Sequence, residues 1–114
     1  MPESRTFETK FFQHLSSKRF AEAEREFTQI RKGTPKTEWN RGYTNALDGM
    51  LLAKRSNDAR PLFLLKIDQN NRKELQMYQK EFSKNAKDDL YSEFDRGFFS
   101  AWANFLSFLL KSKR

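Results

Sequence analysis

The chain has 114 residues, and its 22 Lys or Arg against 15 Asp or Glu give a formal net charge of +7. It has no cysteine, which excludes disulfides and thiolate chemistry, and we expect a cytoplasmic protein. No apolar stretch reaches the about 18 residues that a membrane span needs, so we expect no membrane partner. Twelve Phe against two Ile and no Val favour helices over strands. A chain of this length can bury the core of a single domain, residues 1–114, without a metal.

Three helices are predicted in the first half of the chain. The first covers about residues 5–15, and the second follows Ser16 as its N-cap. Gly33 ends the second helix, and Thr34 and Pro35 begin the third, with the proline at the first helical position. The apolar stripe of the third helix consists of Trp39, Tyr43, Ala46, Leu47, Met50 and Leu51.

The second half of the chain begins after a predicted boundary at residues 56–58. Residues 61–67 form either a short helix or a buried strand, and the apolar run does not decide between them. Asn71 is expected to cap the next helix and Asp89 the last one. The apolar positions of these two helices are Leu75, Tyr78 and Phe82, and then Phe94, Phe98, Ala101, Trp102, Phe105, Leu106 and Leu109.

Two segments of the chain, Glu38–Gly42 and Glu93–Gly97, share the pattern Glu-x-x-Arg-Gly at an offset of 55 in the numbering. Without gaps, nine of the 38 positions from 18 to 55 are identical to their counterparts from 73 to 110. We therefore predict an all-α fold, a compact bundle of five or six helices formed by two tandem, sequence-similar units at about residues 5–56 and 60–111.

The repeated pattern predicts a crossing of the two long helices. A glycine inside a helix costs about 1 kcal/mol relative to alanine, and close approach of a second helix is the usual compensation. The residues assigned to this crossing are Glu38, Arg41, Gly42, Glu93, Arg96 and Gly97. Each Glu can meet its Arg three positions later. In a functional alternative, the two arginines form an anion site, because guanidinium groups suit phosphate and carboxylate.

The last helix is apolar on almost every side from residue 97 to 110, which indicates a central or partner-covered helix. Phe99 and Phe108 lie off its main stripe, and Leu110 extends it. We expect these three residues to contact another protein, of which a second copy of the chain is the simplest case. The leading functional hypothesis is therefore a non-catalytic binding module for protein–protein interaction, including self-association.

A catalytic, cofactor or metal site is not predicted. His14 is the only histidine, and no nucleophile, phosphate-loop or metal-binding motif accompanies it. The alternative function is a basic RNA- or DNA-associated protein that binds weakly and non-specifically through phosphate contacts. A basic stripe on one folded surface would favour nucleic acid, whereas an exposed apolar patch would favour protein.

One helix resembles part of a known repeat family. The segment with Phe20, Ala23 and Phe27, followed by Pro35, is similar to the second helix of a tetratricopeptide repeat, and the similarity extends from position 20 to position 35. The resemblance implies packing in the style of a helical hairpin. The counterpart segment lacks the Ala and the Pro, and the period of 55 differs from that of the family, so we assign no family.

Overall fold

The structure is a computed structural model that describes residues 2–56 and 71–112, and these residues form five helices and no strand. The helices are α1 (Pro2–Ser16), α2 (Phe20–Gly33), α3 (Glu38–Ser56), α5 (Arg72–Ala86) and α6 (Glu93–Ser112). The predicted all-α class is confirmed. Residues 57 and 58 of the predicted boundary, and the ambiguous segment 61–67, lie outside the described residues. Each helix of the described ranges is too short or too polar to cross a membrane.

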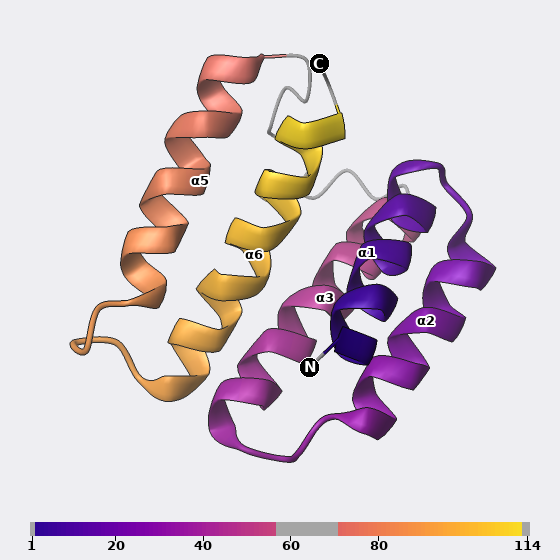
Figure 1. Ribbon diagram of the computed structural model, residues 1–114, viewed down its shortest axis with the longest axis horizontal. Coiled ribbons are helices and arrows are strands. Elements are labelled where there is room, and N and C mark those ends of the chain that lie inside the picture. The colour runs from indigo at the N-terminus through magenta and orange to yellow at the C-terminus, as the bar shows by residue number, and fades with distance from the viewer. Residues whose placement is uncertain (1, 57–70, 113–114) are drawn as a thin grey trace.

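The centre of the bundle is the pair α3 and α6, whose contact is the most extensive between the described helices (Figure 1). α5 packs along α6, and α1 packs against α2. α1 also reaches α6, because the ring of Phe12 lies 5.2 Å from that of Phe105 and 5.7 Å from that of Phe108. α2 contacts α3 far less than α5 contacts α6. The contact between α2 and α3 is therefore less extensive than the contact between α5 and α6.

The core is made of the apolar stripes that the helical spacing predicts. All five described helices contribute to it, and its buried residues are Phe11, Phe12, Leu15, Ala23, Phe27, Ile30, Tyr43, Ala46, Leu47, Met50, Leu51, Leu75, Ala101, Trp102, Phe105, Leu106 and Leu109. Trp39, which the sequence places on the same stripe, is 36% exposed. Its ring stacks on that of Tyr43 at 5.2 Å, at the first turn of α3, instead of entering the core.

Three of the described helices begin with a side-chain cap. Asn71, Thr37 and Ser92 each accept a hydrogen bond from the backbone N–H three residues later, at 3.1, 3.2 and 3.1 Å. Such bonds satisfy N–H groups that the first turn of a helix leaves without a partner. The cap by Asn71 is confirmed, whereas α3 and α6 begin three residues further along the chain than predicted, at Glu38 and Glu93.

The other predicted caps are wrong. The Thr34 hydroxyl donates to the carbonyl four residues before it and so stays attached to α2, and Pro35 lies in the loop instead of the first turn of α3. Asp89 pairs through its carboxylate with an arginine of α6. Ser16 is the last residue of α1, and α2 begins after Arg19 without a side-chain cap. In each case a hydrogen-bonding alternative or a later start displaced the predicted cap.

Candidate functional site

The repeated glycines lie where the backbones of α3 and α6 touch. A Cβ atom built on Gly42 would overlap the carbonyl oxygen of Phe94 and lie 2.7 Å from its carbonyl carbon. A Cβ atom built on Gly97 would overlap the carbonyl oxygen of Trp39 and lie 2.8 Å from its carbonyl carbon. The two contacts are reciprocal, since each glycine meets the residue three positions before the other. Only a residue without a side chain allows this approach.

The repeated arginines take different partners. Arg41 donates to Glu38 at 3.3 Å, and both side chains are mostly exposed, at 67% and 58%. Arg96 donates to Asp89 at 3.3 Å, instead of to Glu93 in the preceding turn. Its Nε atom is buried and has no hydrogen-bond partner among the described residues. The two arginines therefore form two separate ion pairs, one of which differs from the predicted pair.

The three residues expected to meet a partner are half-buried within the chain. The ring of Phe99 lies 5.8 Å from that of Phe82 in α5 and 4.9 Å from that of Tyr91 in the turn before α6. Phe108 and Leu110 pack against the core. The large apolar side chains that are exposed in the described ranges are Trp39, Leu52, Met77, Leu90 and Tyr91, and only the last two are adjacent in the chain.

A pocket of about 470 Å³ lies between α2 and α3, at the loop that joins them. We name it the α2–α3 cleft. Arg31, Lys36 and Arg41 bring three cations to its wall, and Glu38 and Asp48 bring two carboxylates. All five side chains are exposed. The remaining lining consists of an aromatic floor and small polar groups, namely Phe27, Phe94, Thr34, Asn40, Thr44 and Asn45, with Pro35 at the loop.

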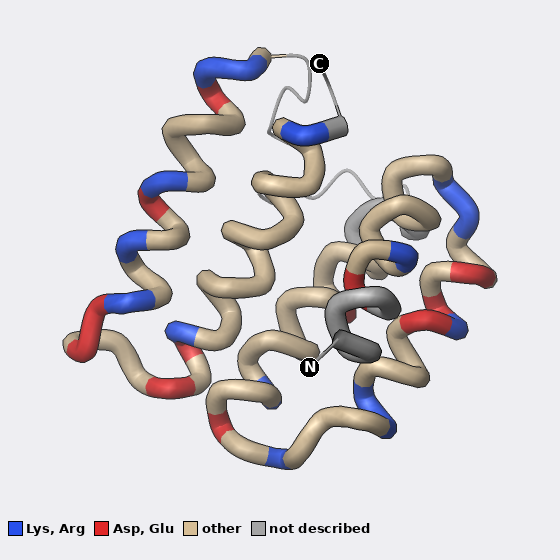
Figure 2. Tube along the Cα trace, viewed as in Figure 1, with Lys and Arg blue, Asp and Glu red and all other residues tan. Residues whose placement is uncertain are grey.

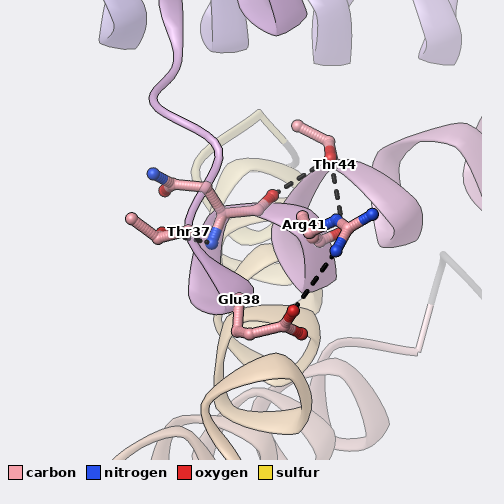
Figure 3. Close-up of polar contacts among 5 residues, drawn as sticks. Thr37, Glu38, Arg41 and Thr44 are labelled. Carbon is pink, nitrogen blue, oxygen red and sulfur yellow. Dashed lines mark hydrogen bonds and ion pairs between the residues drawn. The ribbon is translucent and has the colours of Figure 1, made fainter.

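Two of the three cations in the α2–α3 cleft have a partner within the chain. The guanidinium carbon of Arg31 lies 5.6 Å from the centre of the Phe27 ring, a cation–π arrangement. Arg41 is tethered to Glu38 along the first turns of α3 (Figure 3). Thr44, one turn further, donates its hydroxyl proton to backbone carbonyls of α3 (Figure 3). The cleft therefore combines positive charge with an aromatic floor.

Two residues that line the α2–α3 cleft stand 55 positions before aromatic residues that pack near α5 and α6. Between α5 and α6, the ring of Phe99 fills the space between Phe82 and Tyr91. The residue 55 positions before Phe99 is Thr44, and the residue 55 positions before Tyr91 is Lys36. Both of these smaller or charged residues line the cleft. Sequence reasoning missed them because neither belongs to a motif, although comparison at the offset of 55 contains the signal.

A second pocket, of about 280 Å³, adjoins a polar network between three helices. The hydroxyl of Tyr43 in α3 donates to the carboxylate of Glu8 in α1 and accepts from the amide of Asn104 in α6 at 2.8 Å. Burial, followed by the charge of Glu8, raises the pKa of Tyr43 above its ordinary range. The hydroxyl therefore keeps its proton, and the network ties α1 and α6 to α3.

A row of lysines runs along the outer side of α5. Lys73, Lys80, Lys84 and Lys87 are all exposed, and their spacing of seven, four and three residues places them on one helical face. At 1.5 Å per residue the row is about 21 Å long. Figure 2 shows these basic residues along α5 with acidic residues between them. We name this row the α5 lysine ridge.

His14 is half-buried, and its buried Nδ1 atom has no hydrogen-bond partner among the described residues. Over the same residues, no group of three or more His, Asp or Glu lies close enough together to hold a metal ion. Comparisons of the chain with protein-family models, with curated proteins and with solved structures found no match. The function is therefore argued from the geometry of the cleft and the ridge alone.

Proposed function

We propose that this protein is a non-catalytic helical binding module that recognises another protein through the α2–α3 cleft. The observation that carries the proposal is the open space between α2 and α3, at the place where the α5–α6 pair is filled by aromatic rings. Closing that space with one aromatic residue would bury more apolar surface, and the chain has polar residues there instead. The cytoplasmic location expected from the absence of cysteine remains part of this proposal.

A protein segment suits the α2–α3 cleft better than a small molecule does. Small-molecule sites usually enclose about 70–90% of the ligand surface. Arg31, Lys36, Arg41 and Asp48 are all exposed, so a ligand between them would keep much of its own contact with water. A side chain on the surface of a larger partner tolerates this, because the remainder of the partner's surface covers the rim.

The test compares two versions of the same substitution. Thr44→Phe places an aromatic ring in the cleft, at the position that corresponds to Phe99, whereas Gln76→Phe places one on the exposed side of α5. Tagged wild-type protein and both variants are used to capture partners from the native cell after nuclease treatment. Each captured protein is then purified and measured by isothermal titration calorimetry. We expect binding to survive Gln76→Phe and to be lost with Thr44→Phe; equal affinity for all three proteins would refute the proposal.

The α5 lysine ridge favours a second candidate function, binding to nucleic acid through phosphate contacts. Lys73, Lys80, Lys84 and Lys87 present four positive charges on one surface. Acidic side chains such as Glu81 interrupt this row, and each one repels a neighbouring phosphate. This candidate therefore predicts weak, non-specific binding, and it is ranked second. A partner whose capture is abolished by nuclease would reverse the ranking.

Self-association through α6 belongs to the same proposal of a protein-binding module. Phe99, Phe108 and Leu110 are half-buried against their own chain, so each offers only part of its surface to a second copy. A stable homodimer buries about 800 Å² per partner or more. Light scattering coupled to size exclusion, on wild-type protein at micromolar concentrations, distinguishes a monomer from this dimer.

We also propose that the chain consists of two tandem, sequence-similar units related by the offset of 55 in the numbering. Three features support it. The first residues of α3 and α6, Glu38 and Glu93, are related by this offset, and so are their caps, Thr37 and Ser92. The contacts of Gly42 and Gly97 are exchanged by the same offset. The looser packing of α2 on α3 would then be a divergence between the units.

A further inference from the structure

We propose that the α2–α3 cleft holds a single anionic side chain of the partner, a carboxylate or a phosphoryl group, between Arg31, Lys36 and Arg41. This inference rests on the proposed function, which places the partner at the cleft, and adds the chemistry that is recognised there. The three cations come from α2, from the loop and from α3, so they surround the pocket instead of lying along one helix.

Arg31 is prepared to receive such a group. Its guanidinium carbon lies 5.6 Å from the centre of the Phe27 ring, and this contact leaves the N–H donors of the guanidinium available to a ligand. A guanidinium can form paired hydrogen bonds to two oxygens of one anion.

Arg41 can bind an anion without losing Glu38. Their bond joins one Nη atom to one carboxylate oxygen, and a guanidinium has five N–H donors. Because both side chains are mostly exposed, water screens the pair, and rearrangement around a ligand costs little. Lys36 in the loop adds a third charge.

The two carboxylates of the α2–α3 cleft limit what it accepts. Glu38 and Asp48 line the same pocket as the three cations, so the local charge is only slightly positive. A chain of regularly spaced phosphates would bring negative charge close to both carboxylates. One anionic group, placed between the cations, avoids them. The geometry therefore favours an acidic or phosphorylated side chain of a protein over a nucleic-acid strand.

The test uses inorganic phosphate and three peptides that differ at one position. The peptides have the sequence Gly-Ser-Gly-Ala-X-Ala-Gly-Ser-Gly, where X is serine, glutamate or phosphoserine, and each is titrated into the full chain labelled with nitrogen-15. We expect amide chemical shifts of residues 34, 36–41, 44 and 45 to change in a saturable way with phosphate and with the glutamate or the phosphoserine peptide. The stronger of the two peptides identifies the source of the anion. The serine peptide should leave these amides unchanged.

Charge-matched variants show whether the cations of the cleft are responsible. Arg31→Gln and Arg41→Gln should each raise the dissociation constant about tenfold, the loss expected for one charge-assisted hydrogen-bonded pair. Lys111→Gln removes one positive charge from the last turn of α6 and should change the dissociation constant less than about twofold, because a distant exposed charge is screened. Lys36→Gln, in the loop, provides the same test if a helical variant unfolds.

Two results would overturn the inference. Equal responses to the serine peptide and to its charged relatives would mean that the cleft does not select an anion. Equal weakening by Lys111→Gln and by Arg31→Gln would mean that net charge alone attracts the peptides. In both cases, loss of partner binding with Thr44→Phe would still support the cleft as the protein-binding site. Failure of this inference is therefore distinguishable from failure of the proposed function.

Discussion

Gly42→Ala adds one methyl group to the contact between α3 and α6, and we expect it to destabilise the protein although it improves the helix propensity of α3. The added Cβ atom would overlap the carbonyl oxygen of Phe94 and lie 2.7 Å from its carbonyl carbon and 3.0 Å from its Cα atom. All three are backbone atoms, so no side-chain rotation relieves the overlap. The two helices must therefore move apart.

The size of the effect follows from two opposing contributions. Replacing glycine by alanine inside a helix stabilises it by about 1 kcal/mol. Overpacking a core costs about 1–3 kcal/mol, and a gap of about 1 Å forfeits up to roughly half of the dispersion attraction between facing atoms. Because the contact of α3 with α6 is the most extensive of the described helices, we take the upper value. The net loss is about 2 kcal/mol, which lowers the Tm by roughly 8 °C, because an unfolding entropy of about 2.1 cal/mol/K per residue gives about 4 °C per kcal/mol for 114 residues.

Thermal unfolding followed by far-ultraviolet circular dichroism measures this loss. Gly49→Ala is the matched control, because it lies in the same helix and its Cβ atom would meet nothing within 4 Å. It should raise the Tm by roughly 4 °C, the effect of improved helix propensity alone. Gly42→Leu should destabilise more than Gly42→Ala. If Gly42→Ala proves as stable as Gly49→Ala, the two helices do not touch at this glycine and the reasoning is refuted.

Three further predictions concern other parts of the bundle. Tyr43→Phe should lower the free energy of unfolding by about 1–2 kcal/mol in urea denaturation near neutral pH, because the Glu8 carboxylate loses a donor. The folded state holds the Tyr43 proton more tightly than the unfolded state does, because the pKa of Tyr43 is raised above its ordinary value of about 10. The wild type therefore loses stability as the pH rises above about 10. The Tyr43→Phe variant has no hydroxyl to titrate and should lose less stability over the same range. Fluorescence anisotropy should show weak binding to RNA and to duplex DNA, with an affinity that falls between low and near-physiological salt. The affinity of the double variant Lys80→Gln/Lys84→Gln should depend less steeply on salt concentration. Tight, sequence-selective binding would contradict this prediction. Phe99→Glu should lower the Tm, because it places a charge beside the rings of Phe82 and Tyr91, and an unchanged Tm in circular dichroism would show that Phe99 is a surface residue.

Local pattern was enough to predict the helices, because each apolar stripe repeats at three and four residues. The caps of α3 and α6 were predicted wrongly for a physical reason. The chain has two cap-forming residues before α3, Thr34 and Thr37, and the choice between them depends on whether Thr34 bonds back to α2, which it does. The offset of 55 does not decide between them, since it pairs Thr37 with Ser92 and also Thr34 with Asp89, and all four residues are cap formers.

The candidate site could be predicted only in part. Each glycine of the helix crossing lowers the stability of its own helix, and local structure does not explain why a glycine stands there. This unexplained loss of stability is what predicted the crossing from the sequence. The α2–α3 cleft has no such signal, because it results from the separation of two helices, which depends on how each packs against the remainder of the bundle. Arg31 and Lys36 look like ordinary surface cations until the loop between α2 and α3 brings them to the same pocket.

The α2–α3 pair lacks an aromatic side chain that the α5–α6 pair has, and this difference affects the stability of the fold. Burying one aromatic side chain removes about 150–250 Å² of surface from water, which at about 25 cal/mol per Å² stabilises a fold by several kcal/mol. The α5–α6 pair has this stabilisation through Phe99, whereas Thr44 and Lys36 leave the α2–α3 pair without it. A protein with a net stability of about 5–15 kcal/mol gives up a large fraction of that margin by leaving such a space open. Departures from good packing of this size tend to be found at functional sites, where binding compensates for them. If the cleft is the binding site, occupation by a partner should therefore stabilise the α2–α3 pair more than the α5–α6 pair, which already has its aromatic rings in place.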